Sequence, residues 1–432
     1  MNRPLKIAIA GLGTVGGGVV KALAARGPEL AERAGRPIET VAVSARDAKK
    51  SRGFTIANWQ QDPLALIQSD ADVVVELIGG DEGIARALVE GALDHGKHVV
   101  SANKALLAKH GKVLAEKAEK NKLQLKFEAA VAGGIPIVKT LRESLISHPV
   151  QSVKGILNGT CNYILTEMEA SGRSFADVLK DAQAKGYAEA DPTLDVGGGD
   201  TAHKLALLSS LAFGTAPDLA AMRVVGIEQI TPADIHFASE FGFRIKLLGV
   251  SRRSFDAKGG ARIEQVVHPA MVRARSPLAN VDGAANGVVV DAGEAGPYFF
   301  SGRGAGEAPT ASAVISDLLE IAQGAFTPVF GRPVAGLAAL VPAGPDAAPT
   351  AWYLRFEVLD LPGVLAEIAG QLSQTGVSIE SMIQRGRAPG EPVAIVMITH
   401  ATGGVAVERA LKAIAASDKV RSRPCMIPME AA

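Results

Sequence analysis

The sequence predicts an α/β protein with three parts: a doubly wound parallel sheet, an α+β domain, and a C-terminal ferredoxin-like βαββαβ unit. Three observations carry this prediction. Short apolar runs alternate with amphipathic helical patterns up to about residue 135, which is typical of a doubly wound sheet. Beyond about residue 135, strand and helix patterns no longer alternate regularly. Beyond a stretch rich in Ala, Gly and Pro, a final segment of roughly 80 residues shows the βαββαβ order.

We therefore divide the 432 residues into four segments. Residues 1–135 form the parallel-sheet domain, and residues 136–335 form the α+β domain, which we expect to supply the substrate site and the contacts between subunits. Residues 336–350 have the composition of a linker, because Ala, Gly and Pro together disfavour regular structure. Residues 351–432 form the ferredoxin-like domain.

The first domain begins with an apolar strand over residues 5–10, a glycine turn and an amphipathic helix through about Arg26. An insertion around Gly27–Pro37 delays the second strand. Further strands are predicted at residues 39–44, 73–78 and 98–101, with helices at 63–69 and 83–96.

Periodicity predicts the elements of the other two domains in the same way. The second domain has helical patterns at 138–147, 163–171, 175–185 and 201–214, and strand patterns at 244–251 and 287–291. The third has strands at 352–359, 377–385, 392–400 and 421–427, helices at 364–375 and 405–416, and a hinge at 388–391.

The composition narrows the class of partner. The 45 basic and 45 acidic residues cancel, and only 4% of residues are aromatic, so a nucleic-acid partner is disfavoured and a small molecule is favoured. Only two cysteines occur, Cys161 and Cys425, which excludes a disulfide framework or thiolate metal site. No apolar run reaches the roughly 20 residues of a membrane span, and the N-terminus lacks a signal-peptide pattern. We expect a cytoplasmic protein.

The glycine turn is the predicted cofactor site. It places Gly11, Gly13, Thr14, Val15 and Gly16 between a strand and a helix, where backbone amides and the positive helix end can receive a pyrophosphate. A G-x-G-x-x-G triplet alone is weak in a chain with 47 glycines, and an ordinary tight turn is the alternative. The preceding strand and following helix favour a Rossmann-type NAD(P) site.

The end of the second strand bears on the choice between the two nicotinamide cofactors. An NAD site usually carries an acidic residue there, for the ribose 2′-hydroxyl. This sequence has Arg46 instead, followed by Asp47 and two lysines. Arg46 can pair with a 2′-phosphate or can be an ordinary surface arginine. We favour NADP, with NAD as the alternative.

A charged segment at residues 187–204 holds the predicted catalytic residues. If its three glycines end a loop, Asp200 is the N-cap of the following helix and Lys204 lies one turn further on. A carboxylate beside an ammonium fixes a lysine and tunes its proton affinity, so the pair can move a proton. The alternative is a structural cap with an i,i+4 ion pair. Glu189 and Asp195 can bind the ammonium of an amino-acid substrate.

A second lysine stands where ligands of open α/β sheets bind. Lys104 follows the strand at 98–101, at the carboxyl end of the predicted sheet. It can hold a substrate carboxylate or polarise a carbonyl. The alternative is an exposed lysine at the start of a helix.

These segments together resemble homoserine dehydrogenase, over nearly the whole chain. The resemblance rests on the glycine turn, the S-x-N-K segment at 101–104, G-G-x-P-I at 133–137, N-G-T-x-N-Y at 158–163 and D-x-x-x-K at 200–204. The resemblance implies NAD(P)-dependent interconversion of L-homoserine and L-aspartate 4-semialdehyde, a step in the biosynthesis of threonine, methionine and isoleucine. A triple glycine before Asp200 departs from the family pattern of one glycine and an apolar residue.

The resemblance also implies roles for residues. Lys204 would be the proton donor and acceptor, Lys104 would assist at the reacting end, and Glu189, Asp195 and Asp200 would bind substrate. Residues 302–310 resemble the stretch where the family chain returns to the cofactor domain, so that 305–330 would belong there. Cofactor contacts are implied at Ser101, Lys104 and Gly306. A sodium ion would be held mainly by backbone oxygens of Glu128, Val131, Gly133 and Ile135.

The C-terminal domain resembles an ACT domain through its βαββαβ order and the segment from Asp360 to Leu365. Such domains commonly pair and bind amino acids at their interface. Gly363 permits a close backbone approach at a helix start, so we expect an effector site at Asp360, Gly363 and Val364. The resemblance implies feedback inhibition by threonine and a homodimer or homotetramer.

Two alternative functions stay open. One is a dehydrogenase of another small amino or hydroxy acid, built on the same cofactor domain. The other is an inactive amino-acid-sensing protein, against which the intact Asp200, Lys204 and Lys104 argue.

Overall fold

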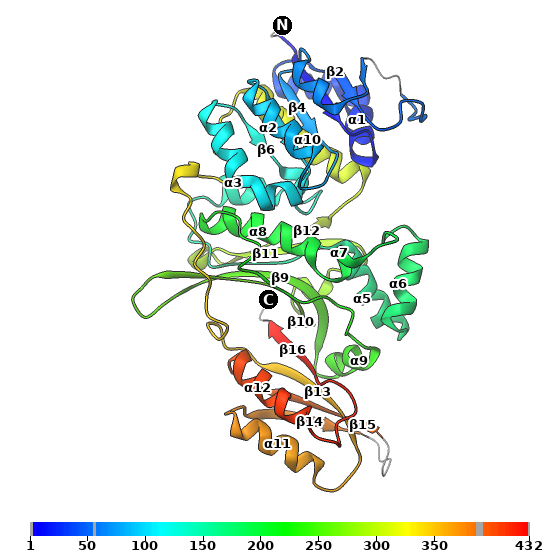
Figure 1. Cartoon of the computed structure of the whole chain (residues 1–432), viewed down its shortest axis with the longest axis vertical. Helices are drawn as coiled ribbons and strands as arrows, with labels where there is room; N and C mark the ends of the chain where they lie inside the picture. Colours follow the sequence, from blue (N-terminus) through cyan, green and yellow to red (C-terminus); the bar gives the residue numbers. More distant parts are fainter. Residues whose placement is uncertain (1–2, 55–57, 386–391, 431–432) are drawn as a thin grey trace. The chain divides into compact units, whose positions relative to one another are not determined.

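The computed structural model describes residues 3–54, 58–385 and 392–430, and its contacts divide the chain into two compact units (Figure 1). The first unit comprises Met1–Gly159, Asp200–Met222 and Ala284–Leu340. The second comprises Thr160–Gly199, Arg223–Gly283 and Val341–Ala432. The hinge predicted at 388–391 lies outside the described residues.

A six-stranded parallel sheet forms the centre of the first unit, in the order β3-β2-β1-β4-β5-β6. Its strands are β1 (Leu5–Ala10), β2 (Ile38–Ser44), β3 (Trp59–Gln60), β4 (Val73–Glu76), β5 (His98–Ser101) and β6 (Leu125–Lys126). The strand order reverses direction between β1 and β4, which is where open α/β sheets bind ligands. The predicted doubly wound sheet is confirmed.

Helices cover this sheet, so its central strands are buried and almost wholly apolar. The helices are α1 (Thr14–Ala34), α2 (Ile84–Asp94), α3 (Lys104–Lys120) and α10 (Glu307–Gln323), with a 3₁₀ segment at Pro63–Gln68. Helix α10 comes from late in the chain, yet Val314 and Leu318 share one core with Ile7 and Val75. The α10 segment therefore belongs structurally to the sheet domain.

Helix α1 is longer than predicted. It runs to Ala34 and ends at Gly35 in the left-handed conformation, so the segment read as an insertion is helical and contains Pro28. Leu30 and Ala34 are buried and continue the apolar face beyond Pro28. Burial of this face outweighs the backbone hydrogen bond that proline removes.

The first unit also contains an antiparallel group of strands and the helix that carries the charged segment. These are β7 (Ser152–Ile156), β11 (Ala285–Asp291), β12 (Pro297–Arg303) and α8 (Gly199–Phe213). The helix predicted at 138–147 is one α-turn, α4 (Ile137–Lys139), followed by a π-helical segment at Thr140–Ser144. Short 3₁₀ turns occur at Glu128–Ala130, Gly293–Ala295 and Val334–Gly336.

The second unit joins an α+β region to the C-terminal domain. Its first elements are α5 (Gly159–Ser171), α6 (Phe175–Ala184), α7 (Thr193–Val196), β8 (Arg223–Val224), α9 (Pro232–Glu240), β9 (Phe243–Phe255), β10 (Ala261–Arg273) and a 3₁₀ turn at Leu278–Asn280. Strands β9 and β10 form a long antiparallel hairpin. None of the helices in the described ranges is both long and apolar enough to cross a membrane.

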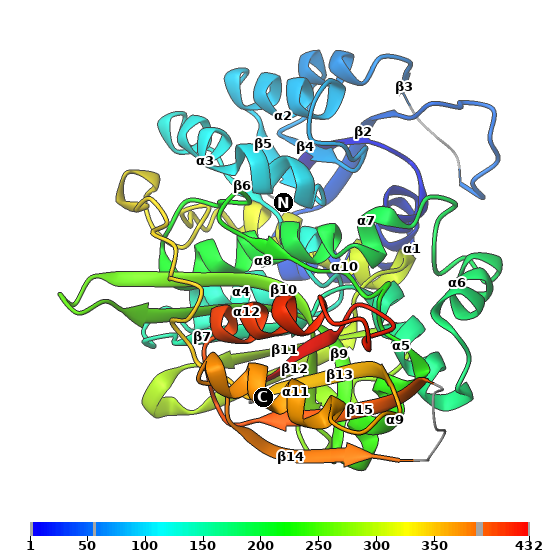
Figure 2. The same cartoon turned by 60° about the horizontal axis from the view of Figure 1, so that its bottom comes forward.

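The C-terminal elements follow the predicted βαββαβ order. They are β13 (Trp352–Leu359), α11 (Val364–Gln374), β14 (Ile379–Gln384), β15 (Pro392–Thr399), α12 (Gly404–Ile414) and β16 (Cys425–Glu430). Their strand order is β16-β13-β15-β14, with α11 and α12 packed on one face (Figures 1 and 2). Strand β16 also pairs in parallel with β10, so the C-terminal sheet continues into the hairpin.

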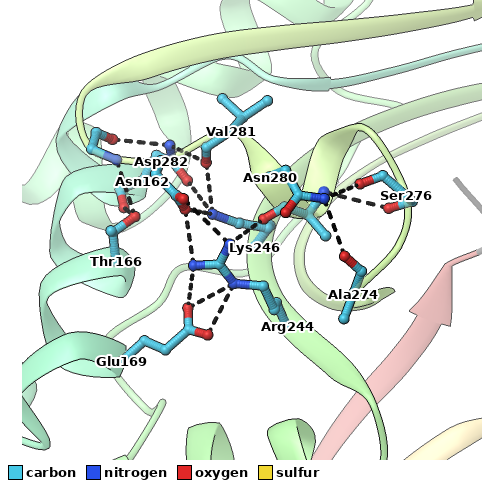
Figure 3. Close-up of polar contacts among 12 residues, drawn as sticks. Asn162, Thr166, Glu169, Arg244, Lys246, Ala274, Ser276, Asn280, Val281 and Asp282 are labelled. Atoms are coloured by element: carbon cyan, nitrogen blue, oxygen red, sulfur yellow. Dashed lines mark hydrogen bonds and ion pairs between the residues drawn. The ribbon is translucent and has the colours of Figure 1, made fainter.

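A buried polar network fixes the start of α5 against β9 (Figure 3). The ammonium of Lys246, which is 1% exposed, donates to Asn162 Oδ1 at 3.2 Å and to the Val281 carbonyl at 2.7 Å. Arg244 forms an ion pair with Glu169 at 2.7 Å. Burial, and next the charge of Arg244, lower the pKa of Lys246.

Candidate active site

Three charged side chains that the sequence places far apart converge in the first unit. Lys204 Nζ lies 2.7 Å from Asp200 Oδ2, and Lys104 Nζ lies 3.0 Å from Asp200 Oδ1. One carboxylate therefore holds two ammonium groups, one on each oxygen. The Asp200 side chain is 5% exposed, whereas Lys104 is 35% exposed.

Local structure sets this geometry. Asp200 and Lys204 lie one turn apart on α8, so their side chains share a face. The helix begins at Gly199, which places Asp200 inside the first turn; the expectation that Asp200 is the N-cap is wrong. Lys104 begins α3 directly after β5, where Asn103 caps the helix by accepting the Leu106 amide.

The Asp200 carboxyl stays ionised. Burial opposes its charge, but the ammonium groups of Lys204 and Lys104 outweigh burial and hold its pKa well below the usual range. Asn158 adds a hydrogen bond from Nδ2 to Asp200 Oδ2 at 2.8 Å. Lys204 also donates to the Leu157 carbonyl at 2.7 Å, so its position is fixed by two acceptors. Asp200 orients the lysines, and the lysines are the groups that can exchange protons.

Two residues of this cluster were not assigned from the sequence. Asn158 opens the N-G-T-x-N-Y segment, which was recognised as a motif without a role for its side chain. His203 is adjacent to Lys204, and burial lowers its pKa. Its Nδ1 is buried and has no hydrogen-bond partner among the described residues. The sequence feature that could have identified His203 is its position directly before the lysine of the D-x-x-x-K segment.

The three glycines of the cofactor turn differ in what surrounds them. Gly11 has φ +101°, and a Cβ there would lie 2.5 Å from the Leu77 carbonyl oxygen. A Cβ on Gly16 would lie 1.9 Å from the Gly11 carbonyl oxygen. Gly13, beside Thr14 and Val15 at the start of α1, has no protein atom within 4 Å of such a Cβ. Gly11 and Gly16 therefore shape the turn, and Gly13 leaves open space at the helix start that fits a dinucleotide pyrophosphate.

A buried acid organises the neighbouring strand ends. Ser101 is fully buried and donates from Oγ to Glu76 Oε2 at 2.6 Å. The other Glu76 oxygen accepts the backbone amides of Ile78 and Gly79, at 2.8 and 3.0 Å. The Ser101 side chain thus supports the turn after β4. Gly306 lies elsewhere in the first unit, as the N-cap of α10 with φ +123°.

The turn after β2 presents positive charge. Arg46 is exposed, and the Asp47 carboxylate is occupied by the backbone amides of Lys49 and Lys50, at 2.8 and 3.2 Å. Arg52 donates to the Leu12 carbonyl at 3.3 Å and so ties this segment to the glycine turn. The role of Arg52 was not predicted.

The predicted cation turn is buried and carries strained backbone. Ala132 has φ 53° and Gly133 has φ 44°. In the described part of the chain, no hydrogen bond is donated to the Val131 and Gly133 carbonyls, which leaves them available as ligands. The Glu128 carboxylate instead accepts the amides of Val138 and Lys139 at the start of α4. No cluster of three or more His, Cys, Asp or Glu side chains within the described ranges can hold a metal.

The remaining predicted residues belong to the second unit. Glu189 is exposed in the connection between α6 and α7, where its carbonyl accepts Gln183 at 3.1 Å. Asp195 lies in α7, and its carbonyl accepts the Cys161 thiol at 3.2 Å. The segment from Asp360 to Val364, with Gly363 at φ +90°, lines a cavity of about 410 Å³.

Comparisons with known proteins agree over the entire chain. Family models match at residues 136–319 (homoserine dehydrogenase), 11–128 (homoserine dehydrogenase, NAD binding domain) and 352–418 (ACT domain). Homoserine dehydrogenases of Neisseria gonorrhoeae and Pseudomonas aeruginosa are 44% and 41% identical, each over 99% of both chains. The crystal structure of a homoserine dehydrogenase from Thiobacillus denitrificans is 41% identical, covers 99% of each chain and has a TM-score of 0.92. The chain therefore belongs to the homoserine dehydrogenase family.

Proposed function

We propose that the protein interconverts L-homoserine and L-aspartate 4-semialdehyde with a nicotinamide cofactor, and that Lys204 moves the proton. The observation that carries this is the buried, ionised Asp200 with a lysine ammonium on each oxygen. The cofactor, when bound, supplies the hydride exchange. A charge pair of this kind has a use in proton transfer and none in a pure sensor.

In the reducing direction, the Lys204 ammonium gives a proton to the oxygen of the aldehyde as that carbon accepts hydride. The reverse reaction returns the hydroxyl proton to the Lys204 amine. Asp200 keeps both lysines in position throughout. Lys104 assists at the reacting oxygen.

We assign the amino-acid end of the substrate to Glu189 and Asp195, whose carboxylates can bind its ammonium. The turn Gly11–Gly16 holds the cofactor pyrophosphate, with further contacts at Ser101, Lys104 and Gly306. We favour NADP because Arg46 is exposed beside two lysines while the Asp47 carboxylate is already engaged.

The other ligands follow from the same assignment. A sodium ion is held by backbone oxygens around Val131 and Gly133, together with those of Glu128 and Ile135. Threonine acts as effector at the cavity formed by Asp360, Gly363 and Val364. The protein is a cytoplasmic homodimer or homotetramer that contributes to threonine, methionine and isoleucine biosynthesis.

The decisive experiment is NADPH oxidation by the purified protein with L-aspartate 4-semialdehyde, repeated with NADH and with added threonine. We expect turnover that is faster with NADPH and slower when threonine is present. A folded protein that turns over neither cofactor would overturn the proposed reaction. Turnover with other small hydroxy acids but not with this pair would support the alternative dehydrogenase.

A further inference from the structure

A second cavity, of about 680 Å³, opens within the second unit and shares no lining residue with the one at Asp360–Val364. One wall is the segment from Arg223 to Gln229, which includes β8. The opposite wall is formed by α12 and β16 of the ACT domain. Helix α12 and strand β16 are labelled in Figure 1.

The cavity combines both signs of charge with an apolar surface. Its acidic lining residues are Glu228 and Glu408, and its basic lining residues are Arg223, Lys412 and Arg423. Arg223 and Glu408 are 3.6 Å apart across the two walls. The apolar lining residues include Trp352, Leu411 and Met426. A ligand that satisfies this surface carries an anionic group, a cationic group and a hydrocarbon part.

A buried polar atom in the lining also accepts or donates no hydrogen bond within the described part of the chain. His268 lines the cavity and is 6% exposed. Its Nε2 has no hydrogen-bond partner among the described residues; Glu430 Oε1 lies 3.6 Å away, outside hydrogen-bond distance. Buried polar atoms are rarely left in this state, because an unmade hydrogen bond costs about 1–3 kcal/mol.

The first wall is in backbone contact with the glycine turn that precedes the catalytic helix. Ile227 donates its amide to the Val196 carbonyl at 2.9 Å. A Cβ on Gly226 would lie 2.3 Å from that same oxygen and 2.7 Å from Gly197 Cα. A Cβ on Gly198 would lie 3.0 Å from Val224 Cγ1, a side-chain contact. The first wall is therefore packed against the turn at Val196–Gly199, which directly precedes Asp200 in the chain.

Both walls are anchored on β10, with which β8 pairs in parallel at Val266 and Val267. Strand β16 pairs with β10 at Met271 and Val272, and Arg252 forms an ion pair with Glu430 at 2.6 Å. A ligand held between α12 and the first wall would bear on the glycine turn through the hydrogen bond from Ile227 to Val196.

We propose that this cavity binds a zwitterionic amino acid with an apolar side chain, and that its occupancy changes catalysis through the turn at Val196–Gly199. Lys412 and Arg423 receive the carboxylate, Glu228 and Glu408 receive the ammonium, and the apolar side chain packs on Trp352. The binding site stands independently of the proposed function; the effect on turnover rests on it.

Binding is tested by calorimetric titration of the full chain with L-leucine and L-methionine. Two probes lack one charge each: 4-methylpentanoate has no ammonium, and 3-methylbutylamine has no carboxylate. We expect at least one amino acid to bind, and each single-charge probe to bind about 10-fold or more weakly than that amino acid. No heat from either amino acid at up to about 10 mM overturns the site.

Location is tested with the double variant Lys412→Gln/Arg423→Gln and with Arg409→Gln, an exposed control on the same helix outside the lining. The double variant should weaken binding about 10-fold, and Arg409→Gln should leave it unchanged. Equal binding by all three proteins overturns the placement. Self-association that disappears in the double variant, without amino-acid binding, would instead make the cavity an interface.

Coupling is tested with the same amino acid in the semialdehyde assay. We expect a change of about twofold or more in kcat or KM that is lost in the double variant and retained in Asp360→Asn. Binding without any kinetic effect overturns the coupling. Because calorimetry does not need turnover, a failure of the proposed reaction is distinguished from a failure of the site.

Discussion

Lys204 and Asp200 lie one helical turn apart on α8, with Nζ and Oδ2 separated by 2.7 Å and both side chains almost buried. The carboxylate cannot act as a proton donor, since its neighbouring ammonium groups hold its pKa far below neutrality. The lysine, held also by the Leu157 carbonyl, is the only proton carrier in this pair. Substitution of Lys204 should therefore affect proton transfer directly.

Replacing Lys204 by Ala should reduce kcat by about 10²–10⁴-fold, because general acid and base catalysis contributes that much. Cofactor affinity should stay within about twofold, since Lys204 is assigned no cofactor contact. Steady-state kinetics and NADPH titration measure both. Lys109→Ala on α3, which breaks an exposed ion pair with Asp81, is the control and should leave kcat unchanged. Turnover by Lys204→Ala at the parental rate would remove this residue from the mechanism.

The glycine turn allows a test that separates shape from ligand contact. Gly13→Ala introduces a Cβ that meets no protein atom, so the variant should fold normally but bind NADPH about 10-fold or more weakly. Gly16→Ala places a Cβ 1.9 Å from the Gly11 carbonyl oxygen and should destabilise the turn itself. Thermal unfolding and NADPH titration of both variants check this. Full NADPH affinity in Gly13→Ala would place the pyrophosphate elsewhere.

Arg46→Ala should lower kcat/KM for NADPH by about 10-fold and change the value for NADH by less than about twofold. The reason is that one charge-assisted contact to a phosphate contributes about 1.5–3 kcal/mol and NADH lacks that phosphate. Arg33→Ala, at the far end of α1, serves as the control. An equal loss of kcat/KM with both cofactors would show that Arg46 does not contact the 2′-phosphate.

Lys246→Met should lower the free energy of unfolding by about 3 kcal/mol. The substitution keeps the volume but removes the buried ammonium that donates to Asn162 Oδ1 and to the Val281 carbonyl, and the carbonyl keeps only its second donor, Asn162 Nδ2 (Figure 3). Denaturant unfolding measures the loss, with exposed Lys258→Met as the control. A loss below about 1 kcal/mol would mean that water or a neighbouring donor replaces the ammonium.

Acid should destabilise the chain through His98, whose Nδ1 accepts the Gln124 amide at 2.9 Å. Burial lowers its pKa from 6.5, so below pH 6.5 the unfolded chain binds the extra proton first. The stabilisation is therefore complete above pH 6.5 and declines as the pH falls, by at most about 1.4 kcal/mol per pH unit. His98→Asn should flatten this part of the stability profile, whereas exposed His400→Asn should not. An unchanged slope in His98→Asn would assign the acid sensitivity to other groups.

Much of the fold follows from local pattern. The alternation of apolar runs and helical periods predicted β1, β5 and β13 at or within a residue of their observed bounds. The reason is that a strand buried on one or both faces of its sheet needs apolar residues at regular positions in the sequence. Helix α1 was predicted to end at about Arg26, but tertiary burial of Leu30 and Ala34 extends it. The helical pattern at 138–147 predicted an α-helix and did not distinguish the π-helical segment after Lys139.

For the candidate site, the sequence by itself determined the Asp200–Lys204 pair, since an i,i+4 spacing on a helix places two side chains on one face whatever surrounds them. It also marked the glycine turn. Only the tertiary structure decided that Lys104 and Asn158 meet the same carboxylate, and that Glu76 organises the strand ends beside Ser101. Such contacts depend on how separate strands and helices pack, and that packing is a property of the whole folded chain rather than of any local segment.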